Sequence, residues 1–199
     1  MSQYWIQTKS GTQFDYVDLE PDMIKITDIA WALVEEKRYV NHTTIPVPVL
    51  EHSLNVSRLL SKEVHWNKLP ANLSDAEYRR LELIGHLHDG SEAYTGDLPS
   101  PLKRLCSGFK LVENRISDAI YLKYLGSAIT AKEKGLLDLA DWASLEDECE
   151  RFLHGGLNFL GKNVSKNPGF PYHFTPQYGL SKVEAMYSFL QRFNNLMGL

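Results

Sequence analysis

Apolar residues recur at helical spacing along most of this chain, and turn-forming residues separate the apolar runs. The pattern predicts a single all-α domain over residues 1–199, organised as a helical bundle. We expect helices at about residues 28–38, 50–60, 76–92, 110–125, 131–154 and 180–197. Gly, Asn and Pro residues predict an irregular loop over 155–179, which leads into a C-terminal helical segment over 180–199.

The first 20 residues follow a different pattern. Residues 4–8 and 13–17 alternate in the manner of short strands, and the turn-forming residues 9–12 separate them. We therefore expect a small N-terminal β-hairpin within residues 1–20. The helix that follows has Thr27 as its predicted N-cap. The β-branched and proline residues of 39–49 predict an extended loop.

Composition limits the class of protein. With 199 residues, of which 43% are hydrophobic, the chain can bury one sizeable core. A formal net charge of −4 provides no general attraction for polyanions, so we expect no nucleic-acid polymer as a partner. Two cysteines are too few for a disulfide framework, and no segment has the pattern of a leader or a membrane span. A cytoplasmic protein without a membrane partner is predicted.

Three potential metal ligands fall on the predicted inward faces of three separate helices: His52, His88 and Asp141. Asp89 follows His88 directly, so one cation could take a ligand atom from each of them. One inward histidine is more often a hydrogen-bonded core residue, and one inward aspartate more often pairs with an arginine. All four together are explained by one divalent cation, which satisfies every group at once. We predict a single metal ion bound by these residues, and the donor set suits Co, Mn, Zn or Mg.

The order His52, His88-Asp89, Asp141 resembles the H…HD…D pattern of the HD-domain metal-dependent phosphohydrolases. Residues 85–103 also resemble the signature HD-x-x-E-x-x-x-G-D-L-P-x-P-x-K of the YfbR-like 5'-deoxynucleotidases. Four further segments are similar to the phage branch of that family, which includes dATP triphosphohydrolases: 5–8, 26–30, 38–43 and 51–53. The resemblance covers roughly residues 4–154. It implies an HD-domain helical bundle, a role in nucleotide metabolism, a homo-oligomer and, for a phage-encoded chain, the host cytoplasm.

The same resemblance implies that Glu92 and Asp97 are catalytic carboxylates. Glu92 comes three residues after Asp89, so a continuing helix turns it toward the predicted metal site. Its role would be to move a proton to or from the reacting water or the departing 5'-oxygen. Without the resemblance, Glu92 would be an exposed helical residue, and Asp97 a turn residue next to Gly96.

Arg38 and Lys103 are the predicted phosphate-binding residues, because arginine offers a planar fork of donors and lysine a movable charge. Tyr39, which follows Arg38, is a candidate for stacking on the base or the sugar, with packing in the core as the alternative.

These residues predict a divalent-metal-dependent phosphohydrolase whose substrate is a deoxynucleotide. The phage-type resemblance favours a dNTP triphosphohydrolase that prefers dATP and releases a deoxynucleoside and triphosphate. The central signature alone fits a 5'-deoxynucleotidase acting on dNMPs equally well. A non-catalytic nucleotide-sensing HD module is the alternative from another class. An oxygenase on the same scaffold would need two irons and more histidine ligands than this chain supplies.

Overall fold

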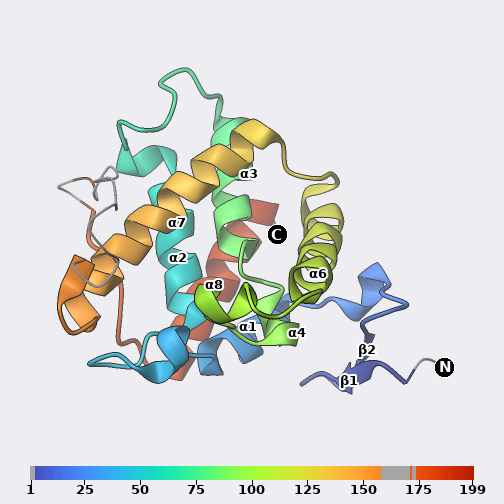
Figure 1. Cartoon of the computed structure of the whole chain (residues 1–199). Helices are drawn as coiled ribbons and strands as arrows, with labels where there is room; N and C mark the ends of the chain where they lie inside the picture. Colours follow the sequence, from blue (N-terminus) through green and yellow to red (C-terminus); the bar gives the residue numbers. More distant parts are fainter. Residues whose placement is uncertain (1–2, 158–170, 172–173) are drawn as a thin grey trace.

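The regular structure is predominantly helical, as predicted (Figure 1). A computed structural model describes residues 3–157, 171 and 174–199. Its longer helices are α1 (Ile26–Glu35), α2 (Val49–Leu59), α3 (Asp75–Leu87), α6 (Phe109–Leu125), α7 (Ala131–Phe152) and α8 (Lys182–Met197). Two short helices are α4 (Glu92–Thr95) and α5 (Ser100–Lys103), and 3-10 turns occupy η1 (Pro21–Met23), η2 (Arg38–Asn41) and η3 (Lys62–Val64).

Helix α2 lies at the centre of the bundle and contacts α1, α3, α7 and α8. Figure 1 shows α7 running across both α2 and α3. Every residue of α2 except Arg58 is buried, including polar ones such as His52. The hydrophobic core is continuous from Phe14 in the hairpin to Phe193 in α8. A polar side chain on α2 must therefore find its partners inside the protein.

The predicted N-terminal hairpin is confirmed, with shorter strands than expected. Strand β1 (Trp5–Gln7) pairs antiparallel with β2 (Gln13–Asp15). Asp28, in the first turn of α1, holds the hairpin loop by accepting hydrogen bonds from the Thr8 hydroxyl and from the Ser10 amide and hydroxyl, each at 2.8 Å. The expectation that Thr27 caps α1 is wrong, because the helix already begins at Ile26.

The predicted helix over 76–92 is also corrected. It begins at Asp75 behind a capping box formed by Ser74 and Glu77, but it ends at Leu87. The chain then turns tightly, with the Gly90 amide donating to the carbonyl of Leu87 at 2.9 Å. A side chain at Gly90 would place its Cβ 2.9 Å from that carbonyl oxygen, so the turn requires glycine.

The prediction of an extended loop over 39–49 is wrong at its start. Tyr39, Val40 and Asn41 all have left-handed backbone conformations, with φ values of 60°, 52° and 60°. The turn is held from both ends: the Arg38 amide donates to the Val47 carbonyl at 3.0 Å, and the Tyr39 hydroxyl bonds to α7. These tertiary contacts override the local preferences of the residues.

The predicted irregular loop over 155–179 falls mainly on residues 158–170 and 172–173, which lie outside the described part of the chain. The predicted C-terminal helix is confirmed as α8, which a capping box formed by Ser181 and Glu184 opens. Among the described residues, no helix combines the length and the apolar character needed to cross a membrane.

Candidate metal centre

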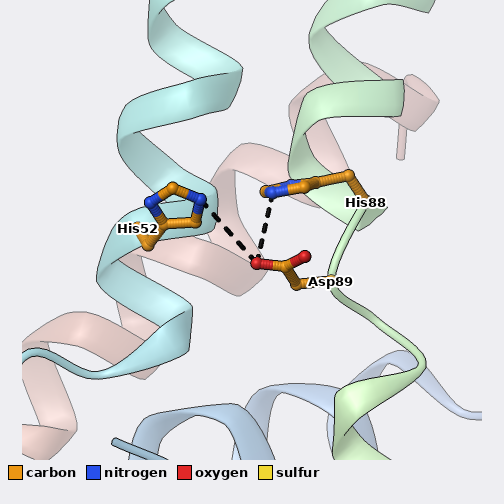
Figure 2. A group of neighbouring side chains, drawn as sticks. All are labelled: His52, His88 and Asp89. Carbon is orange, nitrogen blue, oxygen red and sulfur yellow. Dashed lines mark ion pairs between the residues drawn. The ribbon is translucent and has the colours of Figure 1, made fainter. Parts of the chain in front are cut away.

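Three of the predicted metal ligands form one compact group between α2 and the end of α3 (Figure 2). His52 comes from the middle of α2, His88 is the C-cap of α3, and Asp89 begins the turn that follows. Their potential ligand atoms all lie within 4.8 Å of one another. Asp89 Oδ2 is 3.7 Å from His52 Nε2 and 3.2 Å from His88 Nε2.

The fourth predicted ligand, Asp141, reaches the same histidines from α7. Its Oδ1 lies 2.9 Å from His52 Nε2 and 3.9 Å from His88 Nε2. The Asp141 side chain is 45% exposed, whereas that of His52 is fully buried. Asp141 therefore lies where the group meets solvent, beside both histidines but outside the compact group that they form with Asp89.

Both histidines present the same ring nitrogen to this group, because the other nitrogen is already engaged. His52 Nδ1 lies 2.7 Å from Glu148 Oε1, and His88 Nδ1 lies 2.8 Å from the Gly85 carbonyl oxygen. His88 Nε2 is buried and has no hydrogen-bond partner in the described part of the chain. A buried nitrogen in this position, facing carboxylates, suits a metal ligand.

The charges of the group are strongly coupled. Burial and the charge of Arg38 lower the pKa of His52, but Glu148 and Asp141 outweigh them and raise it to about 10. Burial raises the pKa of Asp89, yet His88, His52 and Arg38 together hold it below its ordinary value. The pKa of Asp141 is likewise lowered by His52 against the effect of burial. Both aspartates are thus ionised and available to a cation at neutral pH.

Glu148 is a site residue that the sequence reasoning did not single out. It is fully buried on α7 and accepts from Arg38 Nε at 2.8 Å and from the Tyr39 hydroxyl at 2.9 Å, in addition to its contact with His52. Burial raises its pKa, but Arg38 and His52 outweigh burial and lower it to about 2. The sequence did contain a signal for Glu148, because helical spacing places it on the same inward face as Asp141, which lies two turns earlier.

Glu92, the predicted catalytic residue, opens α4 directly after the turn and is only 6% exposed. Its Oε1 lies 3.2 Å from Lys103 Nζ, and its Oε2 is buried without a hydrogen-bond partner among the described residues. Burial, together with the charges of Asp89 and Asp97, raises the pKa of Glu92 well above its usual range. The structure thus places close to the metal centre a carboxyl group whose surroundings favour its protonated form.

Asp97 follows Gly96, whose backbone conformation (φ 76°, ψ 158°) is accessible essentially to glycine alone. The Asp97 amide donates to Glu36 Oε1 at 3.2 Å, which fixes this turn against the end of α1. Burial and the nearby Asp89 charge raise the pKa of the Asp97 carboxyl, although Arg38 opposes them.

The two predicted phosphate-binding cations are both held by carboxylates. Lys103, in α5, lies 2.6 Å from Glu113 as well as 3.2 Å from Glu92, and these contacts raise its pKa despite burial. Arg38 donates through Nε to Glu148, and its terminal NH1 lies 3.6 Å from Asp89 Oδ2. Both cations are therefore positioned beside the metal group.

A cavity of about 850 Å³ adjoins the metal centre. Its lining includes all the predicted catalytic and substrate-binding residues together with two of the predicted ligands: Arg38, Tyr39, Asp89, Glu92, Asp97, Lys103 and Asp141. Arg104 and Trp142 also line it, and neither is among the predicted site residues. A smaller cavity of about 380 Å³ meets the same centre and is lined by further carboxylates from Glu113, Asp118 and Asp138.

Comparison with known proteins supports the fold. The chain matches no protein-family model. It is 32% identical over 120 residues to YfdR, an uncharacterized protein of Escherichia coli (strain K12), and this match spans 60% of the chain and 58% of YfdR. Among solved structures it resembles the cyanophage S-2L HD phosphohydrolase DatZ, bound to dA and one catalytic Zn²⁺ ion, with a TM-score of 0.53. That likeness, at 16% identity, covers 88% of this chain and 98% of DatZ, and shows that the chain has the HD phosphohydrolase fold.

Proposed function

We propose that this chain is a divalent-metal-dependent phosphohydrolase that cleaves the 5'-phosphate ester of deoxynucleotides. One observation carries the proposal: two histidine nitrogens and the carboxylates of Asp89 and Asp141 converge beside a cavity that also contains Arg38. The preferred reaction is hydrolysis of a dNTP, with preference for dATP, to a deoxynucleoside and triphosphate. Hydrolysis of dNMPs by a YfbR-like 5'-deoxynucleotidase is the alternative.

The donor set fits a bound cation. Imidazole nitrogens mixed with carboxylate oxygens suit Zn, Mn or Co, and the buried Nε2 of His88 makes no hydrogen bond among the described residues while it faces Asp89. His52, His88, Asp89 and Asp141 are the proposed ligands of one metal ion. When bound, a divalent cation there would polarise a phosphoryl oxygen and lower the pKa of a water molecule.

The protein's own residues supply the remaining chemistry. The terminal nitrogens of Arg38 are free of Glu148 and can bind phosphate oxygens as a planar fork. Lys103 adds a second positive charge at the cavity wall. Glu92, whose raised pKa favours the protonated form, can hold a proton on its carboxyl group and donate it to the departing 5'-oxygen. Asp97, which lines the same cavity, would assist in proton transfer.

The larger cavity supports a nucleotide substrate. A volume of about 850 Å³ lies within the range of small-molecule sites. Its lining combines the apolar and aromatic surface of Trp142 and Leu145 with the cations Arg38, Lys103 and Arg104. Such a lining suits a molecule with one aromatic and one anionic end. DatZ, which shares the fold, is bound to dA and one catalytic Zn²⁺ ion.

One observation favours the monophosphate alternative. The smaller cavity beside the metal centre carries the additional carboxylates Glu113, Asp118 and Asp138, which outnumber the two lysines of its lining, Lys103 and Lys134. A triphosphate tail directed into that cavity would meet several like charges, whereas a monophosphate would leave it empty. The triphosphate reading therefore requires the β- and γ-phosphates to lie on the side of Arg38 and Arg104.

Analysis of the reaction products distinguishes the triphosphohydrolase from the 5'-deoxynucleotidase. Metal-loaded protein is incubated with dATP or dAMP, with Glu92→Gln as the inactive reference. Deoxyadenosine and triphosphate from dATP support the preferred reaction, and free phosphate from dAMP with dATP untouched establishes the alternative. Nucleotide binding without turnover would contradict both and favour a sensing module. Cytoplasmic location and assembly into a homo-oligomer belong to the same proposal.

A further inference from the structure

Glu148 connects the two halves of the site. Its Oε1 lies 2.7 Å from His52 Nδ1, and the Ser144 hydroxyl approaches the same oxygen at 3.4 Å. Its Oε2 accepts from Arg38 Nε at 2.8 Å and from the Tyr39 hydroxyl at 2.9 Å. One fully buried carboxylate thus contacts a proposed metal ligand through one oxygen and the proposed phosphate-binding arginine through the other.

The contact with His52 determines which ring nitrogen keeps its proton when a metal binds. An ionised carboxylate only accepts hydrogen bonds, so His52 Nδ1 carries a proton for Glu148. Nε2 lies 2.9 Å from Asp141 Oδ1, so without a metal it carries a proton as well, and a metal bound by His52 would replace that proton and leave the one on Nδ1. The backbone carbonyl of Gly85 imposes the same arrangement on His88. Glu148 therefore does for His52 what the Gly85 carbonyl does for His88: each accepts the hydrogen bond of Nδ1.

The contact with Arg38 restricts its orientation. Because Nε donates to Glu148, the plane of the guanidinium is fixed relative to α7, and NH1 lies 3.6 Å from Asp89 Oδ2. The Tyr39 hydroxyl shares the same acceptor oxygen, which places the Tyr39 ring at the cavity wall. This arrangement also explains why residues 39–41 adopt left-handed conformations: the turn brings both side chains to one carboxylate.

We propose that Glu148 is a positioning residue that orients His52 for metal binding and Arg38 for phosphate binding at the same time. This inference rests on the proposed function and deepens it. The competing view is that Glu148 is a structural ion pair that ties α7 to residues 38 and 39. That view predicts a loss of stability on substitution and no change in metal affinity.

Substitution of Glu148 by glutamine distinguishes the two views. Gln keeps the size of the side chain but presents one acceptor and one donor, so it cannot accept from both His52 and Arg38. Metal affinity is measured by competition against a chromophoric chelator, using Zn²⁺ and apo protein that retains the wild-type circular dichroism. We expect the affinity of Glu148→Gln to fall by about 10–100-fold. Equal affinity in both proteins would overturn the proposal.

The matched control is Glu82→Gln. Glu82 forms a partly buried ion pair with Arg192, at 2.7 Å, between α3 and α8 and away from the metal centre. We expect this variant to lose thermal stability while its zinc affinity stays within about twofold of wild type. An equal loss of zinc affinity in both variants would show a general effect of removing a shielded ion pair and would contradict the specific role of Glu148.

A measurement on the wild-type protein covers the case in which Glu148→Gln does not fold. Nitrogen-15 NMR of the histidine rings in the zinc-loaded protein reports which nitrogen of His52 carries the proton. The proposal predicts a protonated Nδ1, and a protonated Nε2 would overturn it. If wild-type protein binds no zinc, the proposed function itself fails. If it binds zinc with His52 in the other tautomer, only the role of Glu148 fails.

Discussion

His52 and Asp141 lie 89 positions apart in the sequence, yet the Nε2 of one is 2.9 Å from the Oδ1 of the other. The two residues come from α2 and α7, which pack against each other at the centre of the bundle. The contact places an ionised carboxylate beside the ring nitrogen that also faces Asp89. The packing of α2 against α7 thus brings Asp141 to His52, which the turn after α3 already brings close to Asp89.

Removal of the Asp141 carboxylate should weaken metal binding. Asp141→Asn keeps the shape of the side chain but removes the negative charge that faces both histidines. We expect zinc affinity to fall by at least about a hundredfold, because direct ligands matter at least as much as the residues that orient them. Calorimetric titration of apo protein measures the change. The control is Asp138→Asn on the same helix, whose carboxylate is exposed and pairs with Lys134 at 2.7 Å. A similar loss in both variants would contradict the assignment of Asp141.

Glu92→Gln should abolish turnover without removing the metal. The amide cannot donate a proton to the departing 5'-oxygen as the carboxyl can, so we expect kcat to fall at least about a hundredfold. Zinc content, determined by elemental analysis, should stay at the wild-type level. Glu113→Gln is the control, since it removes the other carboxylate partner of Lys103 and leaves Glu92 in place. Retained turnover in Glu92→Gln would exclude Glu92 as the proton donor.

Val40→Gly should stabilise the fold. Val40 has a left-handed conformation with φ of 52° while its side chain is 59% exposed, so glycine removes backbone strain and little packing. The strain of a left-handed residue is roughly 1–2 kcal/mol, and the extra flexibility of glycine in the unfolded chain offsets part of it. We expect a net gain of about 1 kcal/mol in the free energy of unfolding, measured by urea denaturation. A destabilised variant would show that the Val40 side chain makes contacts that outweigh the strain.

His86 should make the protein less stable in mild acid. The ring is fully buried and stacks on Phe189 at 3.8 Å between centroids, and burial, with a contribution from Arg192, lowers its pKa to about 3. Between that value and the unfolded pKa near 6.5, the unfolded chain binds the extra proton, so stability falls as the pH falls. From pH 7 to pH 5 this single group contributes a loss of about 2 kcal/mol.

The comparison with His86→Leu tests this pH dependence. Leucine keeps an apolar side chain beside Phe189 and removes the titrating group. Urea denaturation at pH 5 and pH 7 gives the change in unfolding free energy for each protein, and that change should be smaller in the variant by about 2 kcal/mol. Equal changes in both proteins would mean that His86 is protonated without cost in the folded state.

The sequence was sufficient for the features that depend on local pattern. Helical periodicity located α2, α6, α7 and α8 to within a few residues, and the apolar neighbours of His52 and Asp141 showed which way these side chains point. The hairpin followed from alternation around the turn at residues 9–12. In each case the information lies within about two helical turns of the residue concerned.

Features that depend on distant partners could not be derived in this way. Glu148 was visible on the same helical face as Asp141, but its partners Arg38 and Tyr39 lie 110 and 109 positions away. The left-handed turn at Tyr39 has the same origin, because no local signal such as glycine marks it. Helix α3 ends early, at Leu87, because the chain makes a tight turn at Gly90. A single glycine in the sequence does not show whether the helix continues through it or ends in a turn.

Metal dependence of nucleotide hydrolysis tests the central claim most directly. The protein is stripped with a chelator, titrated with Zn²⁺, Mn²⁺ or Co²⁺, and assayed with dATP and dAMP while bound metal is counted by elemental analysis. We predict no hydrolysis by the stripped protein and full recovery at one metal ion per chain. Hydrolysis that persists after complete removal of metal, or metal bound in equal amount by His52→Ala and wild-type protein, would contradict the account.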